Sequence, residues 1–171
     1  MATYATRGEI TRSQWNGIIA TASEHLWLYG MAEFGFASDD EVPKIITSAA
    51  VAGCDVRVLL LDPDYAGTAD LDIEEGNPPG TLGPRIRAAL GKFTRMRDQA
   101  GPNMQIRVYN AHPTASLVRG DNRILLTPYM RFFIGSNSPT FELDDDPTDT
   151  IFDRYARHVE NVWHLAREWK S

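Results

Sequence analysis

The spacing of hydrophobic residues changes along the chain between helical and strand-like periods. Apolar positions that recur every three or four residues predict amphipathic helices, and short apolar or alternating runs predict strands. The unbroken run Leu59–Leu61 is typical of a parallel strand that is covered on both faces. The first two-thirds of the chain therefore predict helices over 11–23, 42–50 and 82–99, and strands over 26–31, 55–62 and 104–109.

The last third predicts shorter strands and a closing helix. Strand-like segments occupy 115–119, 123–127 and 132–134, and Gly120-Asp121-Asn122 is a hairpin turn between the first two. Residues 149–169 predict a helix with a broad apolar face. The acidic stretch 63–80 has no apolar period, so we expect a long loop that is functional or mobile.

The order of these elements predicts the fold class. Helices and strands alternate in the first two-thirds, which favours an α/β protein with a mostly parallel sheet and helices on both faces. The late hairpin adds antiparallel strands and makes the sheet mixed. The length of 171 residues is that of a single domain spanning 1–171.

Composition narrows the partners that we expect. The net charge of −6 makes nucleic-acid binding by this domain alone unexpected. Cys54 is the only cysteine, which fits a reducing, cytoplasmic compartment. Met1–Ile10 has neither the basic nor the apolar region of a signal peptide, and no apolar run is long enough for a membrane span.

No cofactor or metal signature stands out. The four histidines have no ligand spacing with each other or with the cysteine, so we expect no zinc site. Gly-rich phosphate-binding loops of the dinucleotide or Walker type are also missing from the sequence. We therefore expect no cofactor.

Three segments together resemble the first half of a phospholipase D-like module. They are the strand Leu26–Gly30, the helix that ends Ala49-Ala50-Val51-Ala52-Gly53, and the strand Val56–Pro63 with its Val-Arg-Val-Leu-Leu-Leu-Asp pattern. The later hairpin with an aspartate at its turn and the Gly135-Ser136-Asn137 corner are similar in layout. The closing helix resembles an uncharacterised bacterial group that often follows DNA-binding domains in regulators. The resemblance implies a three-layer phospholipase D-like fold.

Active members of that family carry His-x-Lys followed by four residues and Asp, in two copies that meet in one chain or across a homodimer. Placing Asp121 at the motif aspartate puts Thr114 at the histidine position and Ser116 at the lysine position. Threonine offers no imidazole nucleophile, and serine carries no cation to hold phosphate. His112 lies two residues too early, so it is a weak catalytic candidate, and we favour a surface histidine before Pro113. The resemblance therefore implies a catalytically degenerate member.

What remains at the motif is a candidate ligand-binding set of polar residues. Arginines on the strands are further candidates for contacting an anion, with structural ion pairing as the alternative. The aspartate and Asn122 also fit a purely structural turn, and the Gly135–Asn137 corner a simple strand end. The ligand-binding set is Thr114, Ser116, Arg119, Asp121, Ser136 and Asn137, with Arg57 and Arg107 as additional anion partners.

These expectations leave three hypotheses of function. The first is a non-catalytic sensory or regulatory module that binds a small, phosphorylated or otherwise anionic ligand and forms a homodimer. The second is a divergent phosphodiesterase or nuclease that acts as a homodimer through His112. The third is a protein-interaction module.

Overall fold

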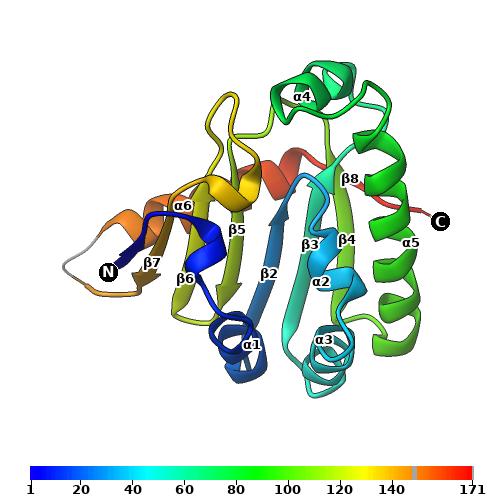
Figure 1. Ribbon diagram of the computed structural model, residues 1–171. Coiled ribbons are helices and arrows are strands. Elements are labelled where there is room, and N and C mark those ends of the chain that lie inside the picture. Colours follow the sequence, from blue (N-terminus) through cyan, green and yellow to red (C-terminus); the bar gives the residue numbers. More distant parts are fainter. Residues whose placement is uncertain (148–149, 171) are drawn as a thin grey trace.

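The protein is described by a computed structural model, which covers residues 1–147 and 150–170. Its centre is one eight-stranded sheet with the order β1-β7-β6-β5-β2-β3-β4-β8 (Figure 1). The strands are β1 Ala2–Tyr4, β2 His25–Gly30, β3 Asp55–Leu61, β4 Met104–Tyr109, β5 Ala115–Gly120, β6 Arg123–Pro128, β7 Thr140–Asp144 and β8 Arg167–Glu168.

The sheet is mixed, but the expectation that it is mostly parallel is wrong. Within the described residues only β2–β3 and β3–β4 pair in parallel, and the other five strand pairings are antiparallel. The reason is the β5–β6 hairpin, whose first strand pairs antiparallel with the edge of β2 that β3 leaves free, so that every strand beyond it is antiparallel. A parallel pair needs a long crossover, whereas the last third of the chain is joined mostly by short turns.

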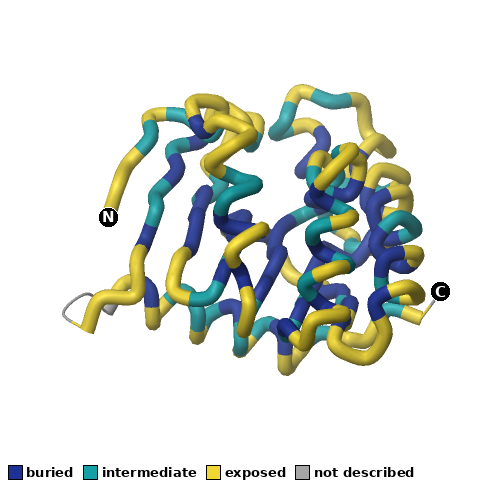
Figure 2. The backbone as a smooth tube through the Cα atoms, turned by 90° about the horizontal axis from the view of Figure 1, so that it is seen from below, coloured by how far each residue is buried: buried dark blue, intermediate teal, exposed yellow. Residues whose placement is uncertain are grey.

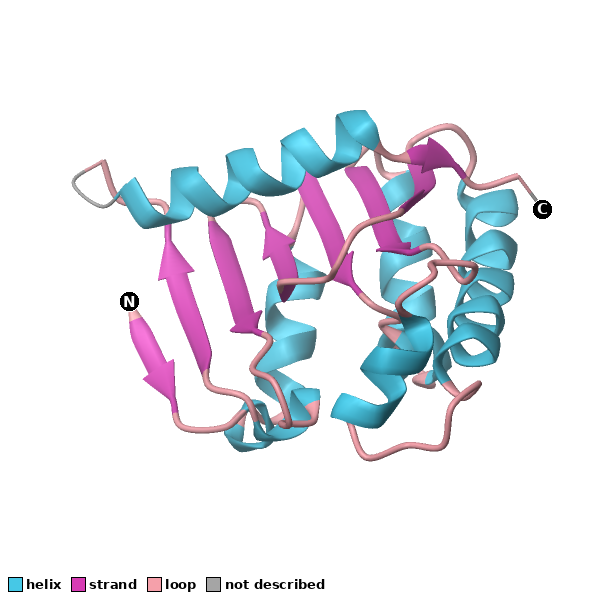
Figure 3. Ribbon diagram, turned by 90° about the horizontal axis from the view of Figure 1, so that it is seen from above, coloured by secondary structure: helices cyan, strands magenta, loops and turns pink. Residues whose placement is uncertain are grey.

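Helices cover both faces of the sheet, as expected. Figure 3 shows α6 lying alone across one face, while α1, α2, α3 and α5 lie on the other. The strands between these layers are mostly buried, and the loops and outer helix surfaces are exposed (Figure 2). The helices are α1 Arg12–Thr21, α2 Phe34–Ser38, α3 Val42–Val51, α4 Thr68–Glu74, α5 Leu82–Ala100 and α6 Thr150–Leu165, with short 3-10 turns η1 Arg7–Glu9 and η2 Gly135–Asn137.

The acidic stretch 63–80 is more ordered than expected, because it contains α4. Asp72 at the end of this helix is fully buried and accepts hydrogen bonds from the backbone N–H groups of Gly80, Thr81 and Leu82. A carboxylate there satisfies the free N–H groups at the start of α5 and suits the positive end of the helix. One of the acidic residues is therefore a structural cap.

Two further corrections concern the end of the chain. Residues 132–134 form no strand; they lie in the loop before η2, and the strand of this region is β7, Thr140–Asp144. The closing helix α6 ends at Leu165, and the chain then adds the short edge strand β8. The predicted helix start at Asp149 lies outside the described residues.

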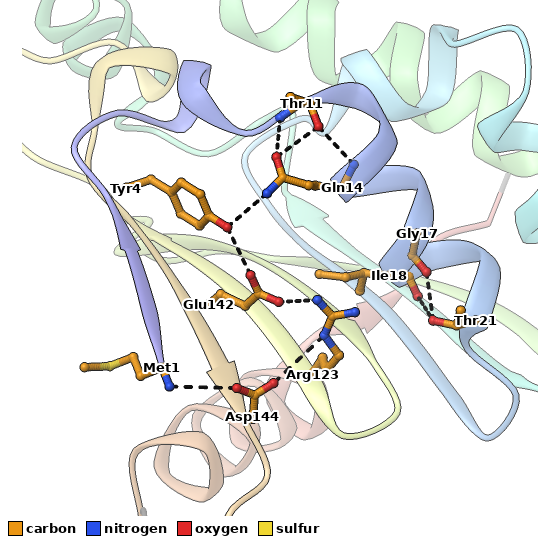
Figure 4. Close-up of polar contacts among 10 residues, drawn as sticks. All are labelled: Met1, Tyr4, Thr11, Gln14, Gly17, Ile18, Thr21, Arg123, Glu142 and Asp144. Carbon is orange, nitrogen blue, oxygen red and sulfur yellow. Dashed lines mark hydrogen bonds and ion pairs between the residues drawn. The ribbon is translucent and has the colours of Figure 1, made fainter.

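The N-terminal segment is attached to the far edge of the sheet and to α1 (Figure 4). The Tyr4 hydroxyl donates to Glu142 at 3.1 Å and accepts from the Gln14 side chain at 3.1 Å. Gln14 also completes a capping box with Thr11 at the start of α1. The same glutamate forms an ion pair with Arg123. These contacts hold the segment between the edge strand β7 and the start of α1, next to the cavity described below.

Across the described part of the chain, the helices are all too short or too polar to cross a bilayer.

Candidate functional site

A cavity of about 700 Å³ opens where β2 ends at Gly30. This end of β2 lies between the parallel strand β3 and the antiparallel strand β5. Ligands in open α/β sheets commonly bind beyond the carboxyl ends of strands, where neighbouring connections diverge. The cavity volume is also in the range of small-molecule sites, which span roughly 300–1,000 Å³.

The floor of the cavity holds a buried charged cluster. The Glu33 side chain is 3% exposed, and its carboxylate accepts a hydrogen bond from the Ser116 hydroxyl at 2.7 Å. The Arg7 guanidinium lies 3.3 Å from the same carboxylate and donates to the Ser116 hydroxyl at 3.3 Å. A buried carboxylate requires such a partner, because removing its countercharge would leave an uncompensated charge in the interior.

The backbone at the floor is itself unusual. Glu33 has φ of 46°, a left-handed conformation that residues other than glycine seldom adopt. A Cβ atom added at Gly30 would overlap the Glu33 carboxylate and lie 3.2 Å from the Tyr129 hydroxyl. The glycine is therefore needed so that the glutamate can fold back under the cavity.

Tyrosines surround this floor and act as hydrogen-bonding groups. The Tyr129 hydroxyl accepts from the N–H of Met31 at 3.3 Å, and the Tyr109 hydroxyl donates to the carbonyl of Gly30 at 3.2 Å. Burial raises the pKa of both tyrosines, and the nearby Glu33 carboxylate raises them further. Both hydroxyls therefore stay protonated across the physiological range.

The walls are largely aromatic and apolar. Trp15 and Phe36 meet edge to face with ring centroids 5.4 Å apart, and the Arg7 guanidinium lies 4.9 Å from the Trp15 ring centre. Such walls suit a flat or apolar part of a ligand. The remaining apolar lining comes from Met31, Ala32, Phe34, Val42, Leu82 and Ile134.

The charged side chains that line the cavity are balanced in sign. Three are arginines and three are acids, so the lining as a whole carries no formal net charge. Arg12 pairs with Asp39 at 2.8 Å, which lowers the pKa of Asp39 to about 2, together with the Glu41 and Val42 N–H groups. Burial raises the pKa of Glu75, and Arg85 acts against that shift. The six are Arg7, Arg12, Arg85, Glu33, Asp39 and Glu75.

The structure brings only part of the predicted set to this cavity. Ser116 lies under it in the buried cluster, and Ser136 on η2 lines it. Thr114 is exposed just before β5, and its carbonyl accepts from the N–H of Tyr129 at 2.9 Å. Asn137 and His112 are exposed and do not line the cavity. None of the four histidines lines it either.

Asp121 lies at the opposite end of β5, at the tip of the hairpin. Its carboxylate accepts from the N–H groups of Ser23, Glu24 and His25 and from the Ser23 hydroxyl, at 2.8–3.0 Å. These contacts tie the hairpin to the start of β2. Burial works to raise the Asp121 pKa, but the hydrogen bonds outweigh it and lower the pKa. Its observed contacts are those of a structural turn.

The three candidate arginines lie beneath α6, away from the cavity. Arg119 lies 4.4 Å from the Trp27 ring centre and donates to the carbonyl of Asp121. Arg57 forms ion pairs with Asp55 and Glu160. Arg107 donates to the carbonyl of Trp163 at 2.8 Å. In the structure these arginines stack on aromatic rings and join the sheet to α6.

Sequence reasoning missed the two charged residues of the floor. Glu33 was detectable, because a lone acid within the apolar and small residues 26–37 is a candidate buried charge. Arg7 gave no such signal, since it belongs to a polar segment and meets Ser116 from 109 positions away. Among the described residues, no group of three or more His, Cys, Asp or Glu side chains could hold a metal ion.

The architecture is that of the phospholipase D family, which solved structures support. Nuc from Salmonella typhimurium, a phospholipase D family member, superimposes with a TM-score of 0.56 at 12% identity, over 91% of this chain and 88% of Nuc. The archaeal chromatin protein TrmBL2, which shows a novel mode of DNA binding, gives a TM-score of 0.62 at 11% identity over 98% of this chain. This chain spans 53% of the length of TrmBL2. At these identities the likeness concerns the fold alone.

The sequence itself places the chain in a family. Residues 39–169 match the domain of unknown function DUF5919, and the chain belongs to that family. No curated protein matches the sequence significantly. The DNA binding of TrmBL2 is a property of that protein, and the expectation that the present domain alone does not bind nucleic acid stays a prediction.

Proposed function

We propose that this domain binds a small organic ligand, phosphorylated metabolites included, in the cavity at the end of β2, and serves as a non-catalytic sensory or regulatory module. The observation that carries the proposal is the cavity itself. It combines aromatic walls with a buried polar floor and a lining whose charges balance. Concave, mostly apolar sites with a few converging polar groups are the usual form of small-molecule sites.

The same geometry argues against phosphodiester cleavage. Phospholipase D-like chemistry needs an imidazole nucleophile, and no histidine lines the cavity. Ser116 stands where the motif lysine is expected, and the nearest cation, Arg7, is already paired with Glu33. Groups arranged in this way can bind a ligand through hydrogen bonds but lack a nucleophile of that kind.

The test is a thermal-shift screen with nucleoside monophosphates, sugar phosphates and inorganic phosphate, each beside its unphosphorylated counterpart. A ligand at one hundred times its Kd stabilises the folded state by about 2.7 kcal/mol. For a chain of this size that corresponds to a rise in Tm of roughly 5–11 °C. If no compound of the panel shifts Tm, the proposal fails.

A matched pair of glycine substitutions locates the binding. Gly35 lines the cavity and Gly91 does not, and a Cβ added at either position has nothing within 4 Å. Gly35→Leu is expected to abolish the shift by occupying the cavity, and Gly91→Leu to retain it. A shift that survives Gly35→Leu would place the ligand elsewhere.

The proposal includes a homodimer. Four large apolar side chains are exposed in the loop beside the cavity, and they offer a surface that a second copy could cover. Native mass measurement at micromolar concentration tests this, and a strict monomer would contradict it. The four are Met130, Phe132, Phe133 and Ile134, between 44% and 74% exposed.

A further inference from the structure

The N-terminal segment, residues 1–10, forms one wall of the cavity. Its turn η1 lies against η2, and the N–H of Arg7 donates to the carbonyl of Ser138 at 2.8 Å. Arg7 and Gly8 from the first turn line the cavity together with residues 134–136 from the second loop. This part of the lining is therefore built from two loops, whereas most of the rest comes from helices α1, α2 and α5.

The outer attachment of the segment is mostly polar, with the partly buried Tyr4 packed against the core. Ile10 is its one buried residue, and β1 adds only three residues to the edge strand β7. Figure 4 shows two of its polar contacts, in which Tyr4 donates to Glu142 and the amine of Met1 pairs with Asp144. Segments with so few buried apolar contacts open locally at a low free energy, without unfolding the core.

The inner attachment, by contrast, centres on the side chain of Arg7, with Ile10 in the hydrophobic core beside it. Arg7 inserts its guanidinium between the ring of Trp15 and the carboxylate of Glu33, and it also reaches Ser116. When the segment detaches, Glu33 keeps Ser116 as its hydrogen-bond donor but loses its countercharge. Detachment therefore removes a wall of the cavity and leaves a buried carboxylate unpaired in the same event.

We propose that the N-terminal segment is a detachable wall of the ligand site, and that Arg7 is the latch that couples its docking to occupancy of the cavity. This inference rests on the proposed function. Contacts from a ligand to Arg7 and Gly8 exist only while the segment is docked, so the ligand selects the docked state. By linkage, docking of the segment strengthens ligand binding by the same factor by which the ligand strengthens docking. A change that releases the segment therefore weakens ligand binding.

The latch is tested without a ligand, by hydrogen–deuterium exchange read by mass spectrometry on the full chain. Arg7→Ala is expected to speed exchange of residues 1–10 at least about tenfold, since it breaks the inner attachment, while peptides from β2 and β3 stay unchanged. Arg87→Ala is the matched control, because this exposed arginine on α5 pairs with Asp64 and belongs neither to the two loops of the wall nor to the cavity lining. It should leave residues 1–10 as in the wild type.

Occupancy is tested with the cavity-filling variant. Gly35→Leu acts as a built-in occupant and is expected to slow exchange of residues 1–10, whereas Gly91→Leu is not. Unchanged or faster exchange in Gly35→Leu, unchanged exchange in Arg7→Ala, or full exchange of residues 1–10 in the wild type would each overturn the inference. A ligand screen without hits would contradict the proposed function. The exchange results do not depend on that screen, and they alone test the role of Arg7.

Discussion

Removing the Asp121 carboxylate is expected to destabilise the fold without touching the cavity. Four donors from residues 23–25 converge on this side chain, at the end of β5 opposite the cavity. Residue 121 has φ of 47°, which glycine adopts freely. Asp121→Gly therefore removes the hydrogen bonds and keeps the turn. Asn122→Ala, an exposed neighbour in the same turn, is the matched control.

The magnitude follows from the kind of contact. A side chain that caps free backbone N–H groups contributes about 0.5–2 kcal/mol, and hydrogen bonds to a charged group lie at the upper end. The Asp121 contacts are partly open to water, so we expect Asp121→Gly to lower the free energy of unfolding by about 2 kcal/mol. This corresponds to a fall in Tm of roughly 4–8 °C, and the control should stay within about 0.5 kcal/mol.

The loss of stability caused by Asp121→Gly should become smaller as the pH falls. The folded state lowers the Asp121 pKa below its ordinary value of 3.8. A carboxyl group of this kind stabilises the fold above its unfolded pKa, and that contribution is lost as the pH falls through the folded pKa. Urea unfolding should therefore give a constant difference between wild type and Asp121→Gly near neutral pH, and a shrinking one below about pH 4. Equal stability at pH 7, or an undiminished difference in acid, would refute the reasoning.

Three further predictions concern other parts of the fold. Gly30→Ala should push Glu33 out of its position under the cavity and lower Tm. A thermal denaturation curve equal to that of the wild type would contradict the close contact between residue 30 and the Glu33 carboxylate. Asp72→Ala should cost about 3 kcal/mol in urea unfolding, because three N–H groups at the start of α5 lose a buried acceptor. Burial raises the pKa of Cys54 to about 11, with help from Asp121, so a maleimide at pH 8 should label it only after unfolding, and rapid labelling of the native protein would show that the thiol is open.

The elements that the sequence predicted well are those with a clear period. Helices α1, α3 and α5 and strands β2, β3 and β4 each bury one regular face or run, and a local pattern suffices to find them. Strand β7 was missed because its short alternation follows an apolar loop, and Phe132–Ile134 in that loop carried the stronger β-like signal. Phe132 in fact has φ of 64°, which is incompatible with a strand.

Strand partners could not be predicted in the same way. The pattern of β5 and β6 identifies a hairpin, but nothing local says that it inserts beside β2. Gly120 shows why the hairpin can lie beside β2. A Cβ atom at this position would overlap the backbone of Ile18, so the glycine allows α1 to pack directly on the end of β5. That requirement becomes visible only when both elements are placed.

The residues of the candidate site were also hard to predict, because they come from distant parts of the chain. Placing the motif by its aspartate selected Ser116, which lies in the cluster under the cavity, whereas the aspartate itself lies at the other end of the strand. The cation near Ser116 comes from Arg7, and the acid that holds it comes from Glu33, two residues far apart in the chain. A motif search reads one strand at a time and cannot detect a site assembled from three segments.

This arrangement also bears on what the site can recognise. In a phosphate-cleaving site, cations face the ligand without competing partners and stabilise charge that develops there. Here Arg7 and Arg12 are each paired with an acid, so an entering anion meets a lining of no net charge. Under the proposed function, affinity then comes chiefly from the aromatic walls and from hydrogen bonds to the polar groups of the lining. Under the proposed function, the cavity at the end of β2 would therefore bind its ligand without a charged pair held ready for phosphate cleavage.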